Sequence, residues 1–174
     1  TLSSLESDAA SNPGAPAGAF ELKSFPVEYQ EGADVGYRWY EKKGQKPLFA
    51  FGHGLSYTSF AYRDLQVRGG DTLSVSFTVT NTGSRPGADV PQLYAVHKGS
   101  SAPMRLAAFT RMTLKPGETR RVTLSAEPRV LADYDTRLPG WRIKSGEYLI
   151  ALGRDATDRS LTATATLNAA TMKP

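Results

Sequence analysis

The sequence contains no cysteine, which excludes disulfide bonds and thiolate metal ligands. It has two histidines, His53 and His97, and their wide separation excludes a short-spaced zinc motif. Asp155 and Asp158 lie close together, but they lack the ligand spacing of an EF-hand calcium loop. The sequence therefore predicts no metal site and no cofactor.

Long hydrophobic runs are also missing. No apolar stretch approaches the roughly 20 residues that a transmembrane helix needs, so we expect no membrane partner. The formal net charge is +4, from 21 Lys and Arg against 17 Asp and Glu. Because the basic residues are scattered among acidic ones, without a basic stripe or a recognisable motif, we expect a solvated mixed surface and no nucleic-acid partner.

The composition divides the chain into zones. Residues 1–19 are rich in Ser, Ala, Gly and Pro, which is typical of a flexible tail or linker. Residues 20–60 are dense in aromatic residues and glycine and show little periodicity, apart from a possible short strand at 34–40. A segment this aromatic should pack against a large surface rather than remain solvated. Residues 61–168 are expected to form a domain, and residues 169–174 a short tail.

From residue 61 onward, apolar and polar residues alternate with a period of two, which is typical of strands with one buried face. In the clearest run, Leu73, Val75, Phe77 and Val79 alternate with Ser and Thr. About seven such runs, separated by turn signals roughly every 8–12 residues, predict an all-β sandwich of the immunoglobulin or fibronectin type III kind. A long, mostly irregular N-terminal extension precedes it.

Pro91 lies inside the expected strand at residues 90–96. Proline cannot donate a hydrogen bond to a neighbouring strand. We therefore expect this strand to be at a sheet edge or to be bulged at Pro91. No segment of the sequence shows a convincing amphipathic helix.

Several sequence blocks together carry a resemblance to a known enzyme family. They are Glu-Gly-Ala-Asp-Val-Gly-Tyr-Arg-Trp-Tyr at 31–40, Pro-Leu-Phe-Ala-Phe-Gly-His-Gly-Leu-Ser-Tyr-Thr-Ser-Phe at 47–60, Asn-Thr-Gly at 81–83, Gly87, Gln-Leu-Tyr at 92–94 and Leu-Lys-Pro-Gly-Glu at 114–118. In this order and spacing they resemble the C-terminal part of glycoside hydrolase family 3 enzymes, the β-glucosidase and β-xylosidase group. The resemblance covers about residues 28–153. Two positions depart from the family pattern: Ala50, where proline is common, and residues 102–105, where an Arg-Pro pair is usual.

The resemblance implies that this chain is part of a longer parent enzyme whose other domains carry the catalytic residues. Family members have a barrel-like domain with an Asp nucleophile, then an α/β sandwich domain that usually carries the acid/base Glu, and in many members a fibronectin type III-like domain. This chain would hold the end of the second domain, the linker and the third domain. The nucleophile motif Ser-Asp-Trp does not occur in the sequence. Because the retaining mechanism needs two carboxyl groups about 5–5.5 Å apart, we expect no catalytic residue in this chain.

The acidic residues of the chain itself offer a weaker alternative. Asp133 and Asp135 would share one face of an extended segment, and Asp155 and Asp158 follow a glycine in a turn. Short Asp spacings in loops are usually turn and capping residues. We therefore interpret both pairs as structural.

The aromatic extension supplies the candidate site residues. The candidates for an interface with other domains are Tyr37, Arg38, Trp39, Tyr40, Phe49, Phe51, His53 and Tyr57. His53, between two glycines, could instead lie near a substrate subsite, or it could be a buried histidine hydrogen-bonded across a domain junction. Trp39 and its neighbours could form a sugar-stacking platform, although an interdomain role fits the family pattern better.

The sequence thus predicts a non-catalytic accessory domain that stabilises the catalytic domains of a parent β-glucosidase. Those domains, on the same polypeptide or on a cleaved partner chain, are the expected partner. One alternative is a carbohydrate-binding module for a β-glucoside or polysaccharide, which would need an exposed row of aromatic side chains. A second is a cleaved fragment that stays bound to the catalytic portion, and a third is a protein-binding adhesion module. The resemblance suggests a secreted or periplasmic location.

Overall fold

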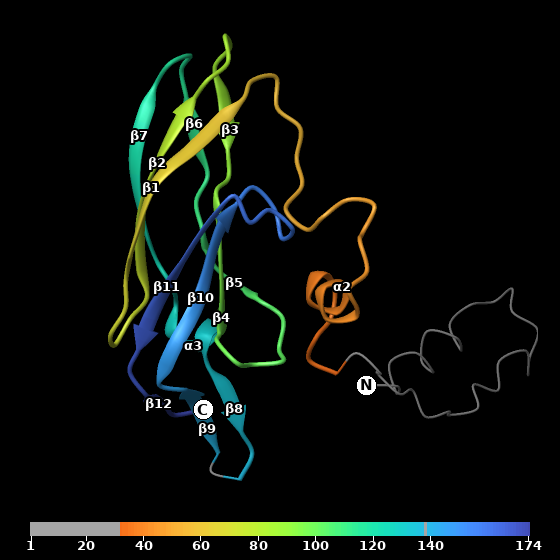
Figure 1. The fold of residues 1–174 in the computed structure, drawn as a ribbon, viewed down its shortest axis with the longest axis vertical. Coiled ribbons are helices and arrows are strands. Elements are labelled where there is room, and N and C mark those ends of the chain that lie inside the picture. The colour runs from red at the N-terminus through yellow and green to blue at the C-terminus, as the bar shows by residue number, and fades with distance from the viewer. Residues whose placement is uncertain (1–31, 138) are drawn as a thin grey trace, which may run out of the picture. The chain divides into compact units, whose positions relative to one another are not determined.

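The structure is a computed structural model that describes residues 32–137 and 139–174 (Figure 1). The chain separates into two compact units, residues 1–30 and residues 31–174. The expected tail at 1–19 and the first part of the aromatic extension, residues 20–31, lie outside the described residues.

Two antiparallel sheets form the sandwich. The three-stranded sheet has the order β1-β2-β7, with β1 at Phe60–Arg68, β2 at Ser74–Asn81 and β7 at Thr119–Ser125. The four-stranded sheet has the order β11-β10-β4-β5, with β11 at Leu161–Leu167, β10 at Gly146–Gly153, β4 at Gln92–His97 and β5 at Arg105–Phe109. These two sheets contain the strands expected from the alternating pattern, and the all-β prediction is confirmed.

Short elements extend the loops of the sandwich. They are β3 at Gly87–Asp89, β6 at Met112–Leu114, α3 at Pro128–Leu131, β8 at Asp133–Asp135, β9 at Gly140–Ile143 and β12 at Ala170–Met172. Strand β12 lies within the expected tail at 169–174, where it pairs with β9. No helix in the described part of the chain is long and apolar enough to cross a membrane.

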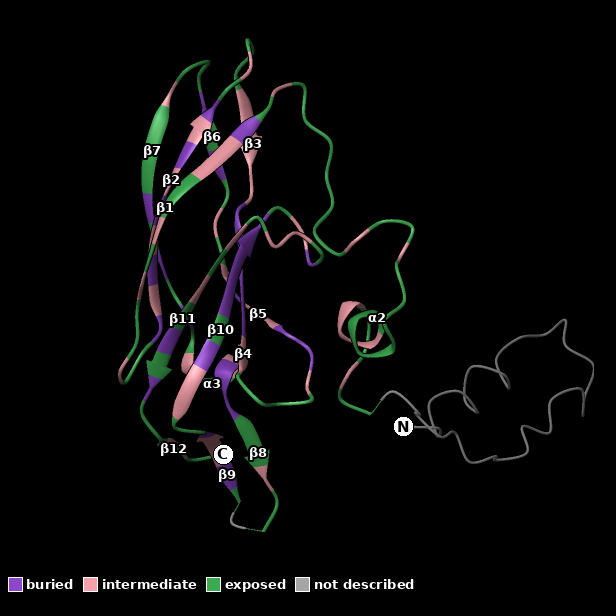
Figure 2. Cartoon of the chain, in the orientation of Figure 1, coloured by how far each residue is buried: buried purple, intermediate pink, exposed green. Residues whose placement is uncertain are grey.

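The main core lies between the two sheets, where buried residues line the facing strands (Figure 2). Strand β2 shows strict alternation, and Val75, Phe77 and Val79 on its inner side are at most 1% exposed, as is Leu73 immediately before the strand. Full burial of each such side chain contributes roughly 1.5–3 kcal/mol. The alternation predicted from the sequence is therefore the pattern that builds the core.

Strand β4 differs from the expectation set by Pro91. It is an interior strand, between β10 and β5, so the predicted edge position is wrong. Pro91 is buried immediately before the first residue of β4, where its missing N–H costs no ladder hydrogen bond. The irregularity in the pairing with β5 lies further along, between Leu93 and Tyr94.

The possible strand at 34–40 is also wrong, because helix α2 occupies Tyr37–Lys43. The helix ends at Gly44, whose φ of 63° gives the left-handed conformation common after helices. Charged residues at four-residue spacing stabilise this part of the chain. Asp34 accepts a hydrogen bond from Arg38 at 2.6 Å and one from Lys42 at 2.8 Å. Charged residues four positions apart are typical of a helix, but the aromatic residues between them led to the prediction of a strand.

Candidate functional site

Residues 32–59 are here called the attachment segment, and part of this segment packs on the outer face of the four-stranded sheet. A second apolar cluster forms there, separate from the main core. Its buried members are Tyr94, Met104, Ala151 and Ala156, and Tyr37, Val96 and Leu106 pack against them. Strand β4 is therefore buried on both faces at its centre, with Leu93 in the main core and Tyr94 in the second cluster.

Tyr37 anchors helix α2 to the sandwich. Its ring stacks on Phe51 with centroids 5.0 Å apart and meets the edge of Tyr94 at 5.9 Å. Its hydroxyl oxygen accepts a 2.9 Å hydrogen bond from the backbone N–H of Leu106 in β5. This aromatic and polar contact fixes the start of the attachment segment on the sheet.

Gln92 fixes the next part of the segment. Its side chain is 4% exposed, and its Nε2 donates to the carbonyl oxygens of Arg154 at 2.7 Å and Gly52 at 3.4 Å. Its Oε1 accepts a 2.6 Å hydrogen bond from the hydroxyl of Tyr94. Burial and the neighbouring Tyr37 raise the pKa of Tyr94, which keeps that hydroxyl protonated as a donor.

Gly52 allows the backbone to approach Gln92 this closely. A Cβ at position 52 would lie 2.2 Å from Gln92 Nε2, and the φ of 86° disfavours any residue with a side chain. The backbone N–H of Ala156 also donates to the Phe51 carbonyl at 2.9 Å. The Phe-Gly-His-Gly sequence is thus explained in part by a close backbone contact with the sandwich.

Asn81 holds the end of the attachment segment. Its Oδ1 accepts hydrogen bonds from Thr58 Oγ1 at 2.6 Å and from the Gly83 N–H at 3.1 Å. Its Nδ2 donates to the carbonyls of Arg85 at 2.8 Å and Leu114 at 3.0 Å. The side-chain amide of Asn81, which is fully buried, is therefore completely paired.

Asn81 and Gln92 are the buried polar residues of the described part of the chain, and both contact the attachment segment. The backbone carbonyl of Asn81 also accepts from Gly117 in the Lys-Pro-Gly-Glu turn at 3.0 Å. Sequence reasoning treated Asn81 as a turn residue and did not single out Gln92. The available signal was that each lies in a short block that carries the family resemblance, Asn-Thr-Gly and Gln-Leu-Tyr.

The attachment segment turns many of its apolar side chains toward solvent. Leu48, Phe49, Leu55 and Tyr57 are 69–95% exposed, and Phe51 is half exposed. Below, "apolar patch" means these five residues. A hollow of about 470 Å³ opens between helix α2 and the loop after β10, and its lining includes Tyr37, Tyr40, Phe49, Phe51, Ala156 and Arg159. Apolar exposure on this scale is characteristic of interaction surfaces.

The candidate residues separate into anchoring and exposed groups. Tyr37 anchors the helix, and Arg38 bonds the Ala33 carbonyl at 2.9 Å in addition to Asp34. Trp39 is half-buried, with Lys43 Nζ 4.6 Å from its ring centroid. These contacts are internal to the segment or directed to the sandwich.

Tyr40, Phe49, Phe51 and Tyr57 belong to the exposed group, and so does His53. The His53 ring lies 5.5 Å from that of Phe49. His53 is thus exposed in this chain rather than buried within it. The interface and sugar-contact predictions for these residues stay predictions.

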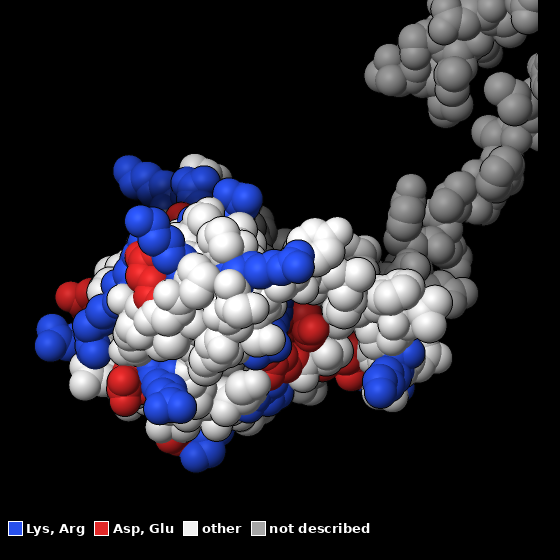
Figure 3. Space-filling view, turned by 90° about the horizontal axis from the view of Figure 1, so that it is seen from above, with Lys and Arg blue, Asp and Glu red and all other residues white. Residues whose placement is uncertain are grey.

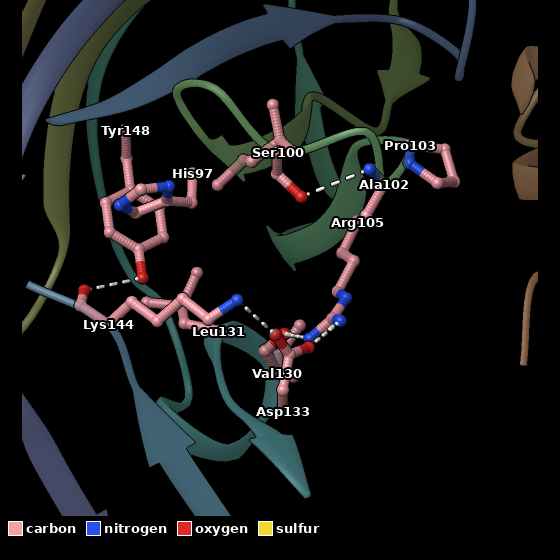
Figure 4. Close-up of a pocket in the computed structure, with 12 residues that line it drawn as sticks. His97, Ser100, Ala102, Pro103, Arg105, Val130, Leu131, Asp133, Lys144 and Tyr148 are labelled. Atoms are coloured by element: carbon pink, nitrogen blue, oxygen red, sulfur yellow. Dashed lines mark hydrogen bonds and ion pairs between the residues drawn. The ribbon is translucent and has the colours of Figure 1, made fainter. Parts of the chain in front are cut away.

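A second hollow lies at the opposite end of β4 from the Gly52 contact, around His97, Arg105, Asp133, Lys144 and Tyr148 (Figure 4). Its volume is about 30 Å³, room for about one water. Arg105 donates to Asp133 and, at 2.7 Å, to the carbonyl of Ala132, as Figure 4 shows in part. Lys144 Nζ lies 3.7 Å from Asp133. The Lys and Arg side chains that line this hollow thus both contact its one carboxylate, Asp133.

The acidic residues weighed in the sequence have structural contacts. Asp135 pairs with Arg142 at 2.8 Å, and Asp133 pairs with Arg105. Asp155 Oδ1 accepts the backbone N–H of Thr157 at 2.9 Å, which is the turn role that its spacing predicted. In the described residues, no group of His, Asp and Glu side chains could hold a metal ion.

Asp158 closes the turn after β10. Its Oδ2 accepts the backbone N–H of Arg154 at 3.0 Å, and its Oδ1 accepts that of Ser160 at 2.9 Å. Burial opposes the charged form, but these hydrogen bonds outweigh it and lower the pKa of Asp158. The carboxylate is therefore held charged as a turn cap and is unsuited to act as a general acid.

Comparison with known proteins identifies the fold family. A model of the fibronectin type III-like domain matches residues 89–156. The thermostable β-glucosidase B of Acetivibrio thermocellus is 43% identical over 140 residues, which cover 76% of this chain and 18% of that protein. The probable β-glucosidase K of Emericella nidulans is 42% identical over 132 residues, covering 73% of this chain and 15% of that protein.

Solved structures agree with this assignment. β-Glucosidase 3B from Thermotoga neapolitana, in complex with glucose, matches with a TM-score of 0.76 and 37% identity, over 84% of this chain and 21% of that chain. A GH3 β-glucosidase of Bifidobacterium adolescentis matches with a TM-score of 0.74 and 32% identity, over 80% of this chain and 21% of that chain. The chain spans about a fifth of the length of these relatives. The chain thus corresponds to a fibronectin type III-like part of family 3 glycoside hydrolases.

Proposed function

We propose that this chain is a non-catalytic accessory domain that packs on the catalytic domains of a family 3 β-glucosidase and stabilises them. The parent activity would be the retaining hydrolysis of terminal β-glycosidic bonds. The observation that carries the proposal is the apolar patch, which the chain exposes and at the same time fixes in place. Such a surface is explained by a partner that covers it.

The fixing contacts favour a permanent partner. Tyr37, Gln92 and Asn81 hold three successive points of the attachment segment on the sandwich. The patch residues between these points are therefore ordered before any partner binds. An ordered surface loses less conformational entropy on association, so more of the apolar burial energy becomes binding energy.

The absence of a catalytic role rests on the acidic residues. Asp133 and Asp135 are paired with arginines, and Asp155 and Asp158 cap a turn. A retaining glycosidase needs one carboxylate as nucleophile and one as acid/base, facing each other across the sugar. These four carboxylates are committed to other contacts, so we infer that the catalytic pair comes from the rest of the parent enzyme.

The first test is an assay of the purified chain with an aryl β-glucoside over a wide range of protein concentration. We expect no turnover above the buffer rate. Turnover that survives repurification and scales with the amount of chain would contradict the proposal. It would mean that a catalytic pair exists in the chain or in a retained partner.

The stabilising role needs a separate test in a whole enzyme. In a chimera, residues 32–174 replace the aligned region of the Acetivibrio thermocellus relative, and the temperature of half-inactivation is measured. We expect Phe49→Ser/Leu55→Ser to lower that temperature, because the patch would no longer be covered by apolar contacts. The matched control is Thr119→Ala/Thr123→Ala on the far sheet, which should leave it unchanged. Equal half-inactivation temperatures for the patch variant and the parent chimera would contradict the stabilising role.

The structure offers little for the carbohydrate-binding alternative. The exposed aromatic residues of the described sandwich, Phe109 and Tyr134, lie on β5 and β8 in different sheets. They do not form the row that stacks on a sugar chain. We expect the chain to pass through a column of neutral β-glucan without delay, and specific retention that glucose oligomers compete away would favour that alternative.

A further inference from the structure

The outer face of the three-stranded sheet carries a concentration of positive charge. The arginines that supply it come from β1 and β7, which are far apart in the sequence. The pairing of β1, β2 and β7 places alternate residues of each strand on this face. The outward residues are Ala61, Arg63, Gln66 and Arg68 of β1, Ser74, Ser76, Thr78 and Thr80 of β2, and Thr119, Arg121, Thr123 and Ser125 of β7. The face therefore contains three arginines among hydroxyl and amide groups, and none of these residues is acidic.

Arg121 is held across the sheet. Its Nη2 donates to Gln66 Oε1 and to Ser76 Oγ, each at 2.8 Å, so the side chain reaches from β7 over β2 to β1. Arg121 and Arg68 both line a polar hollow of about 260 Å³. The guanidinium group of Arg121 is thus oriented before any ligand arrives, which lowers the entropy cost of binding an anion.

The positive charge of this face is not neutralised within the described residues. Arg63, Arg68 and Arg121 form no ion pair there with a carboxylate, whereas Arg105, Arg120 and Arg142 each do. Asp64 is exposed at the irregularity of β1, where the regular pairing with β2 is interrupted. The end view in Figure 3 shows basic and acidic side chains interspersed over the molecule.

The chemistry of the face selects the kind of anion. Guanidinium groups bind carboxylates through paired hydrogen bonds, and Ser, Thr and Gln side chains suit a ligand rich in hydroxyl groups. The outward residues include no aromatic ring to stack on a nucleic-acid base and no large apolar side chain to enter a lipid surface. We propose that the outer face of β1, β2 and β7 binds a carboxylated polysaccharide. This inference goes beyond the accessory role and does not depend on it.

The test uses the full 174-residue chain. Its affinity for polygalacturonate is measured by calorimetry and by retardation in gels that contain the polymer. The variant Arg68→Gln/Arg121→Gln removes the two arginines of the hollow, and Arg85→Gln/Arg111→Gln removes two exposed arginines outside the face. We expect the first variant to lose roughly tenfold or more in affinity and the second to lose less than about twofold. Equal losses, or no binding by the unaltered chain, would overturn the proposal.

Further probes separate this binding from general attraction to polyanions. Fully methyl-esterified polygalacturonate has no charge and should not bind. Single-stranded DNA of similar charge should bind at least about tenfold more weakly at 0.15 M salt, because the face lacks stacking side chains. DNA binding equal to that of the carboxylated polymer would overturn the assigned ligand class.

A folding control keeps the result interpretable. Thermal unfolding followed by circular dichroism establishes that each variant is folded at the assay temperature. Arg63→Gln supplies a second variant on the same face that leaves the Arg121 contacts with Gln66 and Ser76 in place. It should weaken binding by about threefold, and an unchanged affinity would contradict participation of the whole face.

Discussion

In the sandwich, Phe77 is completely buried, whereas in the attachment segment Phe49 leaves 69% of its surface exposed. The same residue type thus occurs in two different environments. Phe77 completes the core that the two sheets build for themselves. Phe49 stands on an ordered segment whose apolar side chains face outward. The difference indicates which part of the molecule is folded for its own stability and which part is prepared for a partner.

The two regions also differ in how they are held. Apolar burial between facing strands stabilises the sandwich, and its strands pair in continuous antiparallel ladders. The attachment segment has one short helix and is fixed by side-chain hydrogen bonds from Asn81, Gln92 and Tyr37. Single polar substitutions should therefore release the segment more readily than they unfold the sandwich.

The largest expected effect comes from truncating the two phenylalanines. Phe77→Ala removes a fully buried ring from the core and should lower the free energy of unfolding by roughly 3–5 kcal/mol. Phe49→Ala should change it by no more than about 0.5 kcal/mol, because the ring is mostly in water already. Urea unfolding followed by circular dichroism measures both. Similar losses for the two variants would contradict the distinction between the regions.

Replacing Asn81 should come next. Asn81→Leu leaves the carbonyls of Arg85 and Leu114 and the hydroxyl of Thr58 without a buried partner. The bond to Leu114 is buried and the other two are partly buried; since an orphaned buried group costs about 1–3 kcal/mol, we expect a total loss of about 3 kcal/mol in urea unfolding. Thr58→Val removes one of these hydrogen bonds and should cost about 1 kcal/mol. If the Thr58 variant is as unstable as the Asn81 variant, the contacts of Asn81 with Arg85 and Leu114 contribute nothing measurable, and this prediction is wrong.

Gly52→Ala should act on the attachment segment and spare the sandwich. The new methyl group would collide with the Gln92 amide, so the contact between Phe51 and Ala156 should open. Amide exchange at Ala156 should accelerate by about tenfold or more, with the β2 amides unaffected. Gly44→Ala is the matched control, because Gly44 also has a positive φ but no atom near the added Cβ. Equal acceleration at Ala156 in the control would assign the effect to backbone strain instead.

Tyr37→Phe should have a smaller effect. It keeps the ring contacts and removes the acceptor of the Leu106 N–H, so we expect a local loss of about 1 kcal/mol. Hydrogen exchange at Leu106 should become faster while the midpoint of urea unfolding stays nearly constant. An unchanged exchange rate at Leu106 would show that ring packing alone holds helix α2.

The pH dependence should give the smallest effect. The pKa of Asp158 is lowered in the folded chain, so its contribution to stability is present above about pH 4 and is lost as the pH falls through the folded pKa. Burial raises the pKa of Asp89. Ionisation of Asp89 therefore lowers the stability of the folded chain, which opposes the effect of Asp158 at slightly higher pH. Asp158→Asn should flatten the acid limb of unfolding stability by about 0.5 kcal/mol or less, since the group is only partly buried and solvent screens its interactions. An acid limb as steep as that of the unaltered chain would contradict this role.

Predicting the strands from the sequence succeeded where one face of a strand is buried. In β2, β7 and β11 the alternation of residue types follows directly from the alternation of side-chain direction. At β4 the strand itself was predicted, at residues 90–96, but its position in the sheet was not, because Pro91 lies just before the strand rather than within it. The prediction of a strand at 34–40 failed, because the aromatic residues there obscured the helical spacing of Asp34, Arg38 and Lys42.

The sequence by itself determined the all-β class, the positions of most strands and the resemblance to family 3 enzymes. It also excluded disulfide bonds and thiolate metal ligands, because it contains no cysteine. These depend on residue type and local order, which the chain carries without folding. Only the tertiary structure decided that Asn81 and Gln92 hold the attachment segment and that Arg63, Arg68 and Arg121 share one face. Those groups lie far apart in the sequence, and strand register and buried hydrogen bonding alone bring them together.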